Sequence, residues 1–302
     1  MRVVSVLPSA TEIVCALGHR DELVARSAEC DYPASVRELP VVMRPRTWDA
    51  DQPSGAIDAR VRKTRAAHES LYELDIDLLR SLDPDLILTQ DLCGVCSVTD
   101  AEVASACAKA DVAPRIVSLT PRTLSDVWGS VETVGRELQE PARGRDLARA
   151  LRLRTTAARL GADSPRIAVV EWLDPPIVAG LWAPEMVRAA GGRSVGVRRG
   201  KPGVRTSWSD LAAARPDLVV LSPCSFPVER TLQELAQTDI GREVGRLRPS
   251  LGTYLADEAF FSRPGPRLAD GVELLRSLLH GAPHAPPMPV EAWSAPGVEA
   301  SG

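Results

Sequence analysis

Three cysteines and two carboxylates stand where the sequence could support metal or redox chemistry. Cys93 and Cys96 form a Cys-x-x-Cys at the end of a predicted strand, and two thiolates at that spacing can bind a soft metal ion or cycle as a dithiol. No second Cys-x-x-Cys or pair of histidines follows nearby. A tetrahedral transition-metal site would therefore need Cys224 as a third sulfur and Glu171 or Asp174 as an oxygen donor. Close packing where a strand meets a loop is the alternative explanation, and it is the one that we favour.

Glu171 and Asp174 are also the candidate catalytic residues. They lie on either side of Trp172 and ahead of Pro175 and Pro176, two residues that fix the course of the loop. A carboxylate in a cleft beside an indole can have a raised pKa and act as a general acid or base. The same carboxylates could instead accept hydrogen bonds from neighbouring amides and hold the loop in place, and we favour this structural role.

Candidate ligand-binding residues follow the ends of the predicted strands. In open parallel sheets, ligands bind beyond the carboxyl ends of the strands, so the residues at those positions are candidates whatever their identity. An exposed indole in a loop offers a flat apolar face to a planar or bulky ligand, although ordinary packing explains each tryptophan equally well. The predicted ligand-binding residues are Ser9, Thr11, Gln90, Asp91, Trp172, Trp182, Trp208 and Phe260.

The overall composition argues against several classes of function. The 302 residues include 36 basic and 40 acidic side chains and have a formal charge of −4, which leaves no basic surplus for binding nucleic acid. No apolar run approaches the roughly 20 residues that span a bilayer. A predicted strand begins almost at Met1 with no export leader ahead of it. The sequence therefore predicts a cytoplasmic protein if Met1 is the native start.

Short β-branched runs alternate with helical patterns along the chain, which predicts parallel sheets with crossover helices. The second half of the chain repeats features of the first. Pro84-Asp85-Leu86 and Pro216-Asp217-Leu218 each end a predicted helix and start an apolar strand. The strand at 3–7 likewise corresponds to the run at 167–170. These correspondences, which occur in matching order, predict two similar lobes.

A helical stretch separates the two repeated halves. From Thr123, apolar residues recur at three- and four-residue spacing, and the pattern restarts at Pro141 and continues to Gly161. We therefore predict an α/β protein with two Rossmann-like lobes joined by a long helix, and with a ligand cleft between them. The predicted parts are an N-terminal lobe at 1–120, a helical bridge at 121–163, a C-terminal lobe at 164–280 and a disordered Pro/Ala-rich tail at 281–302.

The segment Val3–Glu12 is similar to the opening of the cobalamin- and iron-siderophore-binding proteins of ABC importers. The resemblance spans roughly residues 2 to 279 and is strongest to chains usually labelled cobalamin-binding proteins, many of which carry Gln-Asp-Leu-Cys with a second Cys three residues on. The further segments that carry it are Cys30–Pro33, Thr89–Cys93, Glu171–Pro176, Pro184–Val187, Ala190–Gly192 and Arg263–Arg267.

This resemblance implies a corrinoid held between two Rossmann-like lobes by apolar and aromatic contacts and a few hydrogen bonds. The chain departs from the pattern at two places. Leu181 stands where similar chains often carry a His, and Ala259-Phe260-Phe261 stands where they often show an Asn. Both departures make the predicted cleft more apolar.

Two hypotheses about function follow. The first is a soluble binding protein that encloses cobalamin or another tetrapyrrole-like ligand in a cleft lined by Trp182, Trp208 and Phe260. The alternative is a cytoplasmic enzyme on the same scaffold, in which the three cysteines and Glu171 hold a metal or perform acid/base work on a small metabolite. The partner is a small molecule in both cases. An ABC permease is not expected for a leaderless chain, because delivery to an importer takes place outside the cytoplasmic membrane.

Overall fold

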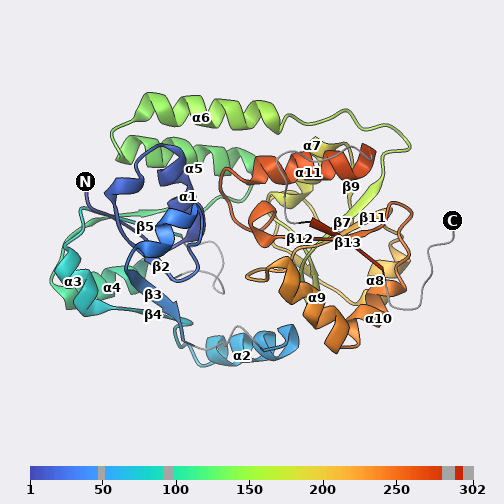
Figure 1. The fold of residues 1–302 in the computed structure, drawn as a ribbon, viewed down its shortest axis with the longest axis horizontal. Coiled ribbons are helices and arrows are strands. Elements are labelled where there is room, and N and C mark those ends of the chain that lie inside the picture. Colours follow the sequence, from blue (N-terminus) through green and yellow to red (C-terminus); the bar gives the residue numbers. More distant parts are fainter. Residues whose placement is uncertain (47–51, 91–97, 281–289, 295–302) are drawn as a thin grey trace. The chain divides into compact units, whose positions relative to one another are not determined.

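The computed structural model describes residues 1–46, 52–90, 98–280 and 290–294, and the chain divides into two compact α/β units. Unit 1 comprises residues 1–52 and 56–152, and unit 2 comprises residues 53–55 and 153–302. Each unit is built on its own sheet (Figure 1). Within the described ranges, no helix combines the length and apolar character needed to cross a membrane. The predicted mixed α/β fold with two similar halves is confirmed.

Unit 1 contains a six-stranded sheet in the order β4-β3-β2-β1-β5-β6. Every neighbouring pair is parallel except β3 and β4. Its strands are β1 (Val3–Ser5), β2 (Leu23–Ser27), β3 (Val41–Pro45), β4 (Tyr72–Leu74), β5 (Leu86–Thr89) and β6 (Arg115–Ser118). The helices are α1 (Pro8–Ala16), α2 (Ser54–Ala66, whose first two residues belong to unit 2), α3 (Ile76–Leu82), α4 (Asp100–Ala110), α5 (Leu124–Glu137) and α6 (Pro141–Arg154), with short 3-10 turns at Arg20–Glu22 and Ala34–Glu38.

Unit 2 contains a seven-stranded sheet in the order β10-β8-β7-β11-β12-β13, with β9 paired to β7. The strands are β7 (Arg166–Leu173), β8 (Pro176–Val178), β9 (Arg193–Ser194), β10 (Val204–Arg205), β11 (Leu218–Leu221), β12 (Thr253–Ala256) and β13 (Val290–Trp293). The helices are α7 (Ala183–Ala190), α8 (Trp208–Ala213), α9 (Val228–Gln237), α10 (Ile240–Gly245) and α11 (Leu268–His280), with a 3-10 turn at Glu258–Phe260. β7, β11 and β12 are parallel, so their carboxyl ends meet at one edge of this sheet.

The internal repeat has the same hydrogen bonds in both units. Asp85 in unit 1 accepts a bond from the backbone N–H of Arg2 (2.7 Å), and its own N–H donates to the Arg2 carbonyl (2.9 Å). Asp217 in unit 2 forms the same two bonds with Arg166, at 2.8 and 2.7 Å. Each Asp thus ties the start of a central strand to the start of its neighbour. The correspondence predicted from the two Pro-Asp-Leu segments is therefore structural.

The predicted helical bridge consists of two helices in contact. A Thr123–Asp126 capping box starts α5, as the apolar spacing predicts. A Cβ on Gly135 would lie only 2.7 Å from the Cα of Gly144, so α5 and α6 meet backbone to backbone where only glycine fits. The second helix, α6, ends at Arg154, before the predicted end at Gly161.

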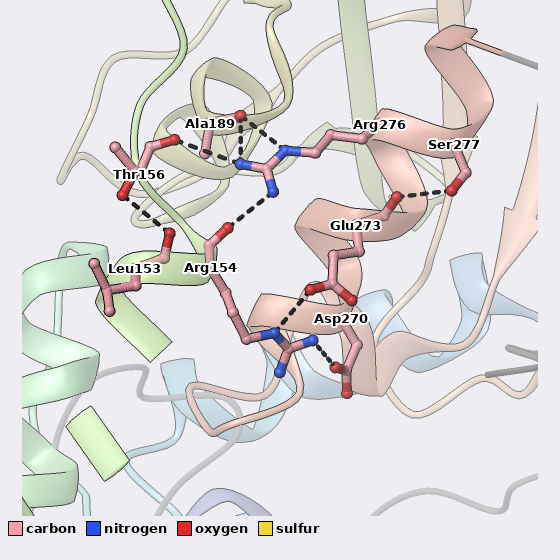
Figure 2. Close-up of polar contacts among 8 residues, drawn as sticks. All are labelled: Leu153, Arg154, Thr156, Ala189, Asp270, Glu273, Arg276 and Ser277. Carbon is pink, nitrogen blue, oxygen red and sulfur yellow. Dashed lines mark hydrogen bonds and ion pairs between the residues drawn. The ribbon is translucent and has the colours of Figure 1, made fainter. Parts of the chain in front are cut away.

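Two arginines fix the end of α6 and the segment that follows it within unit 2 (Figure 2). The guanidinium of Arg154 contacts Asp270 (2.5 Å) and Glu273 (2.8 Å), one helical turn apart on α11. Arg276, farther along α11, donates to the carbonyls of Arg154 (2.9 Å) and Ala189 (3.0 Å), the latter at the end of α7. Since α7 also packs against α11, these ionic and carbonyl contacts join three segments of unit 2.

The C-terminal tail contributes a strand to unit 2. β13 pairs antiparallel with β12 at the sheet edge, with Thr253 opposite Trp293 and Ala256 opposite Val290. Pro- and Ala-rich composition predicted disorder for the whole of 281–302, and for 290–293 that expectation is wrong. A short alternating run, Val-Glu-Ala-Trp, is sufficient to pair with an existing edge.

Candidate functional site

Ser9 and Thr11, both predicted to bind ligand, are buried at the carboxyl end of β1 in unit 1. The Thr11 hydroxyl donates to Ser5 Oγ (2.8 Å), and the Ser5 hydroxyl in turn donates to the carbonyl of Leu7 (2.9 Å). Cys30 Sγ lies 3.1 Å from Thr11 Oγ1. These contacts tie the first turn of α1 to β1 and to the loop that follows β2, so Thr11 uses its hydroxyl within unit 1.

Gln90 lies directly after β5, as predicted, and only 8% of it is exposed. Its Oε1 atom is buried and has no hydrogen-bond partner among the described residues. Buried acceptors are rarely left unpaired, which makes this amide a candidate for contact with a ligand. The next predicted residues, Asp91, Cys93 and Cys96, lie outside the described residues.

Tyr32 is a candidate that reasoning from individual residues missed. It follows β2 in unit 1 and is half-exposed, at 50%, which is high for so large a ring. The same rule that selected Ser9 and Gln90, position after the carboxyl end of a parallel strand, would have selected Tyr32 had it been applied to the loop after β2. An exposed phenol offers both a flat ring and a hydrogen-bonding hydroxyl to a ligand.

In unit 2, the structure brings together two members of the predicted Cys/Glu cluster. Glu171 lies near the end of β7, and its carbonyl accepts a hydrogen bond from the backbone N–H of Cys224 (3.0 Å) in the loop after β11. A Cβ on Gly203 would lie 2.0 Å from Glu171 Oε1, so the carboxylate packs directly on that glycine. Asp174 packs in the same way on Gly55, where a Cβ would lie 2.3 Å from Asp174 Oδ2.

Trp172 belongs to an aromatic cluster at the same edge of the sheet. Its indole N–H donates to the carbonyl of Asp174 (3.1 Å), and its ring meets Phe226 edge to face with centroids 5.4 Å apart. The Phe226 ring is buried, at 1% exposure, whereas Trp172 is only half-buried. The guanidinium of Arg230 also lies on the Phe226 ring, with its Cζ 3.5 Å from the ring centroid. Neither Phe226 nor Arg230 was predicted as a site residue.

The indoles of Trp182 and Trp208 are buried, at 4% and 8% exposure, so the open faces expected of them are absent. Trp208 packs in the hydrophobic core of unit 2. Trp182 donates through Nε1 to the carbonyl of Phe261 (2.7 Å), and Phe260 beside it is 6% exposed. Leu181 has a φ of 51° and donates through its N–H to the Lys201 carbonyl (2.6 Å). A ligand contact of Trp182, Trp208 or Phe260 stays a prediction.

A buried ion pair that was not predicted lies after β12. Glu258 accepts a bond from Arg263, and both side chains are 11% exposed. Burial raises the pKa of Glu258, while Arg263 and the backbone N–H of Ser225 oppose that rise. Ser225, next to Cys224, has a φ of 61°, so Glu258 secures a left-handed turn in the loop after β11. The pair holds two strand-end loops together.

The predicted metal site is only partly described. Among the described residues, no group of three or more His, Cys, Asp or Glu side chains is arranged to hold one metal ion. Because Cys93 and Cys96 lie outside that set, a site made with Cys224 stays a prediction.

Of the comparisons with known proteins, the one with solved structures gives matches. No protein-family model matches the sequence, and no curated protein sequence does so. Among solved structures, a periplasmic heme-binding protein from Pseudomonas aeruginosa is 19% identical, with a TM-score of 0.66 over 98% of this chain and 95% of that one. The heme-binding protein RhuT from Roseiflexus sp. RS-1 is 20% identical, with a TM-score of 0.65 over 93% and 98%.

The periplasmic vitamin B12-binding protein BtuF of Vibrio cholerae is also 20% identical, with a TM-score of 0.62 over 92% of this chain and 96% of that one. These matches cover both units and agree with the resemblance carried by the sequence motifs. The chain therefore has the fold of the periplasmic heme- and vitamin B12-binding proteins.

Proposed function

We propose that the protein binds a tetrapyrrole-type ligand, of which heme and corrinoids are the two classes to consider. The observation that carries the proposal is the fold, since solved binding proteins for heme and for vitamin B12 match this chain over more than nine-tenths of its length. Ligand binding on open α/β sheets uses the residues beyond the carboxyl ends of the strands.

Each unit, taken by itself, has residues at those edges that suit a planar, largely apolar ligand. Tyr32 in unit 1 and Trp172 in unit 2 are aromatic rings that are not fully buried. Each follows or ends a parallel strand, β2 or β7. Gln90 adds a buried acceptor without a partner among the described residues. Aromatic faces and a few placed polar groups are the usual contacts of a large cofactor, and each unit supplies such candidates separately.

The proposal is tested by titrating the purified full chain with hemin and, separately, with aquacobalamin, while recording absorption from 300 to about 700 nm. Binding predicts a saturable spectral shift and co-elution of colour with protein in gel filtration. Lysozyme in both titrations shows how much colour follows a protein non-specifically. Absence of a saturable shift and of co-elution with both compounds would contradict the proposal.

Variants measured in the same titration show whether particular residues contact the ligand. Tyr32→Ala and Trp172→Ala each remove an aromatic ring that this proposal names, one in each unit, as a candidate ligand contact. Replacing Trp293, which lies on the far edge strand β13, provides the matched control. If all three variants bind as the native chain does, these two aromatic residues are not part of the binding site.

A further inference from the structure

Arg26, in strand β2 of unit 1, holds both ends of the loop at residues 28–37. Its Nη1 atom donates to the carbonyls of Ser27 (3.0 Å) and Ala28 (3.2 Å), where the loop begins. Its Nη2 atom donates to the carbonyl of Arg37 (3.0 Å), where the loop ends. A guanidinium carries its N–H donors in one planar fork, so a single side chain can bond carbonyls on both sides of a loop. Arg26 therefore closes this loop at its base.

Further contacts fix the loop on either side of Tyr32. The carbonyl of Asp31, directly before Tyr32, accepts a hydrogen bond from Nε of Arg37 (3.2 Å). Cys30 and Val36 are 1% and 0% exposed, so each anchors the loop in the interior of unit 1. Tyr32 itself is 50% exposed. A half-exposed ring is thus carried by a backbone that is held at its base, before the ring and after it.

The order of this loop affects the free energy of ligand binding. A loop that is ordered before the ligand arrives avoids the entropy that binding would otherwise lose in ordering it. Compact surface loops whose ends lie close together are frequently functional. The hydrogen bonds from Arg26 are charge-assisted, which makes them stronger than bonds between neutral groups. Since they act on the loop backbone, Arg26 can influence a ligand through the position of Tyr32.

Another arginine of unit 1 makes similar bonds away from any candidate residue. Arg80 donates to the carbonyls of Lys109 (2.9 Å) and Ala110 (3.2 Å), at the end of α4. The helix α4 contains none of the candidate ligand-binding residues named above. Arg80 is therefore the matched control for Arg26, because its replacement removes guanidinium bonds to backbone carbonyls in the same unit.

We infer that Arg26 is a positioning residue for ligand binding, which closes the loop at 28–37 and so holds the Tyr32 ring ready for the ligand. The inference rests on the proposed function, in which Tyr32 is a candidate ligand contact, and deepens it by assigning the residue that orders that contact. Without the guanidinium, the carbonyls of Ala28 and Arg37 lose a shared donor, and the loop has to be ordered as the ligand binds.

A cycle of two single variants and the double variant tests whether Arg26 acts through Tyr32. The native chain, Arg26→Gln, Tyr32→Ala and the double variant are each titrated with hemin and with aquacobalamin. With the compound that the native chain binds, Arg26→Gln is expected to weaken binding by about tenfold. In the Tyr32→Ala background the same change should weaken binding by less than about twofold, because the ring that the loop positions is absent. Arg26→Lys, which keeps the charge but lacks the planar fork, should bind with intermediate affinity.

Amide hydrogen exchange of the unliganded chain measures the order of the loop directly. Arg26→Gln should speed exchange at residues 28–37. Arg80→Gln should leave both the exchange of that loop and the affinity unchanged while lowering the melting temperature. Circular dichroism of each variant shows whether the fold is retained. If Arg26→Gln does not fold, Arg37→Gln removes the bond to Asp31 and tests the same loop, with an expected loss of affinity of about threefold.

The possible outcomes separate the inference from the proposed function. Native-like affinity or native-like exchange in Arg26→Gln overturns the inference, and so do equal losses of affinity in the native and Tyr32→Ala backgrounds. An equal loss of affinity in Arg80→Gln shows that affinity follows stability alone, which also overturns it. If Tyr32→Ala binds as the native chain does, the inference fails and tetrapyrrole binding stands. If the native chain binds neither compound, both fail.

Discussion

Replacing Arg154 by alanine tests whether the arginine clamp stabilises unit 2. The change removes contacts of 2.5 Å to Asp270 and 2.8 Å to Glu273, and leaves those two carboxylates one turn apart on α11 without their shared cation. The three side chains are 26–37% exposed. Buried hydrogen bonds to charged groups contribute roughly 1.5–3 kcal/mol each and exposed ion pairs roughly 0.2–1 kcal/mol, so partial exposure gives a loss of about 1–2 kcal/mol in all.

Urea unfolding of the full chain, followed by far-ultraviolet circular dichroism, measures this loss. Arg152→Ala is the control, because Arg152 on the same helix forms an ion pair with Glu132 (2.7 Å) and is more exposed, at 43%. The control should lose no more than about 0.5 kcal/mol. Equal losses in the two variants, or a loss below about 0.5 kcal/mol for Arg154→Ala, would show that the clamp contributes no more than an ordinary surface pair.

The clamp also predicts a pH dependence with a definite sign. Hydrogen bonding and charge from Arg154 lower the pKa of Glu273 below its ordinary value of 4.5. A carboxyl whose pKa is lower in the folded state stabilises that state above its unfolded pKa and loses this contribution as pH falls through the folded value. The stability difference between native protein and Arg154→Ala should therefore be full at pH 7 and shrink below about pH 4.5. A constant difference down to pH 3 would refute the ionic explanation.

Three other changes test contacts within unit 2. Ser54→Ala removes the hydroxyl that donates to the buried carboxylate of Glu234 and should lower the unfolding free energy by about 1–3 kcal/mol, whereas Ser54→Thr should restore it. Asp217→Ala removes the acceptor at the strand start and should cost about 1 kcal/mol in thermal denaturation, with Asp217→Asn losing less. Glu258→Ala removes the carboxylate that pairs with the buried Arg263 and should lower the unfolding free energy by about 3–5 kcal/mol. Replacing Arg263 as well should recover part of that loss, and a double variant no more stable than the single one would argue against the ion pair.

Features set by local sequence pattern were predictable, and those set by distant packing were not. The Pro-Asp-Leu segments predicted corresponding strands, and Asp85 and Asp217 indeed bond the same backbone groups in each unit. Trp182 was expected to be exposed because its flanking residues read as a loop. Its indole is buried and donates a hydrogen bond to the carbonyl of Phe261, 79 positions along the chain. No local sequence pattern predicts so distant a partner.

The candidate site also combines features that the sequence predicts with features that depend on distant packing. Topology alone places the ends of β7 and β11 together, which is why Glu171 and Cys224 could be predicted as neighbours. The stack of Arg230 on Phe226 depends on how the loop after β11 turns into α9. Neither residue type nor spacing specifies that turn, so the stack became visible only in three dimensions.

One buried carboxylate at the edge of the unit 2 sheet serves structure and not proton transfer. A general acid or base needs a titratable group that can reach a substrate. Glu258, whose pKa is raised by burial, is instead held by Arg263 and by the Ser225 amide, and it secures the turn between two loops. The half-buried groups at this edge include the flat ring of Trp172 and the guanidinium of Arg230. Glu171 and Asp174 are carboxylates at the same edge, so the alternative of acid/base chemistry there depends on those two residues and not on Glu258.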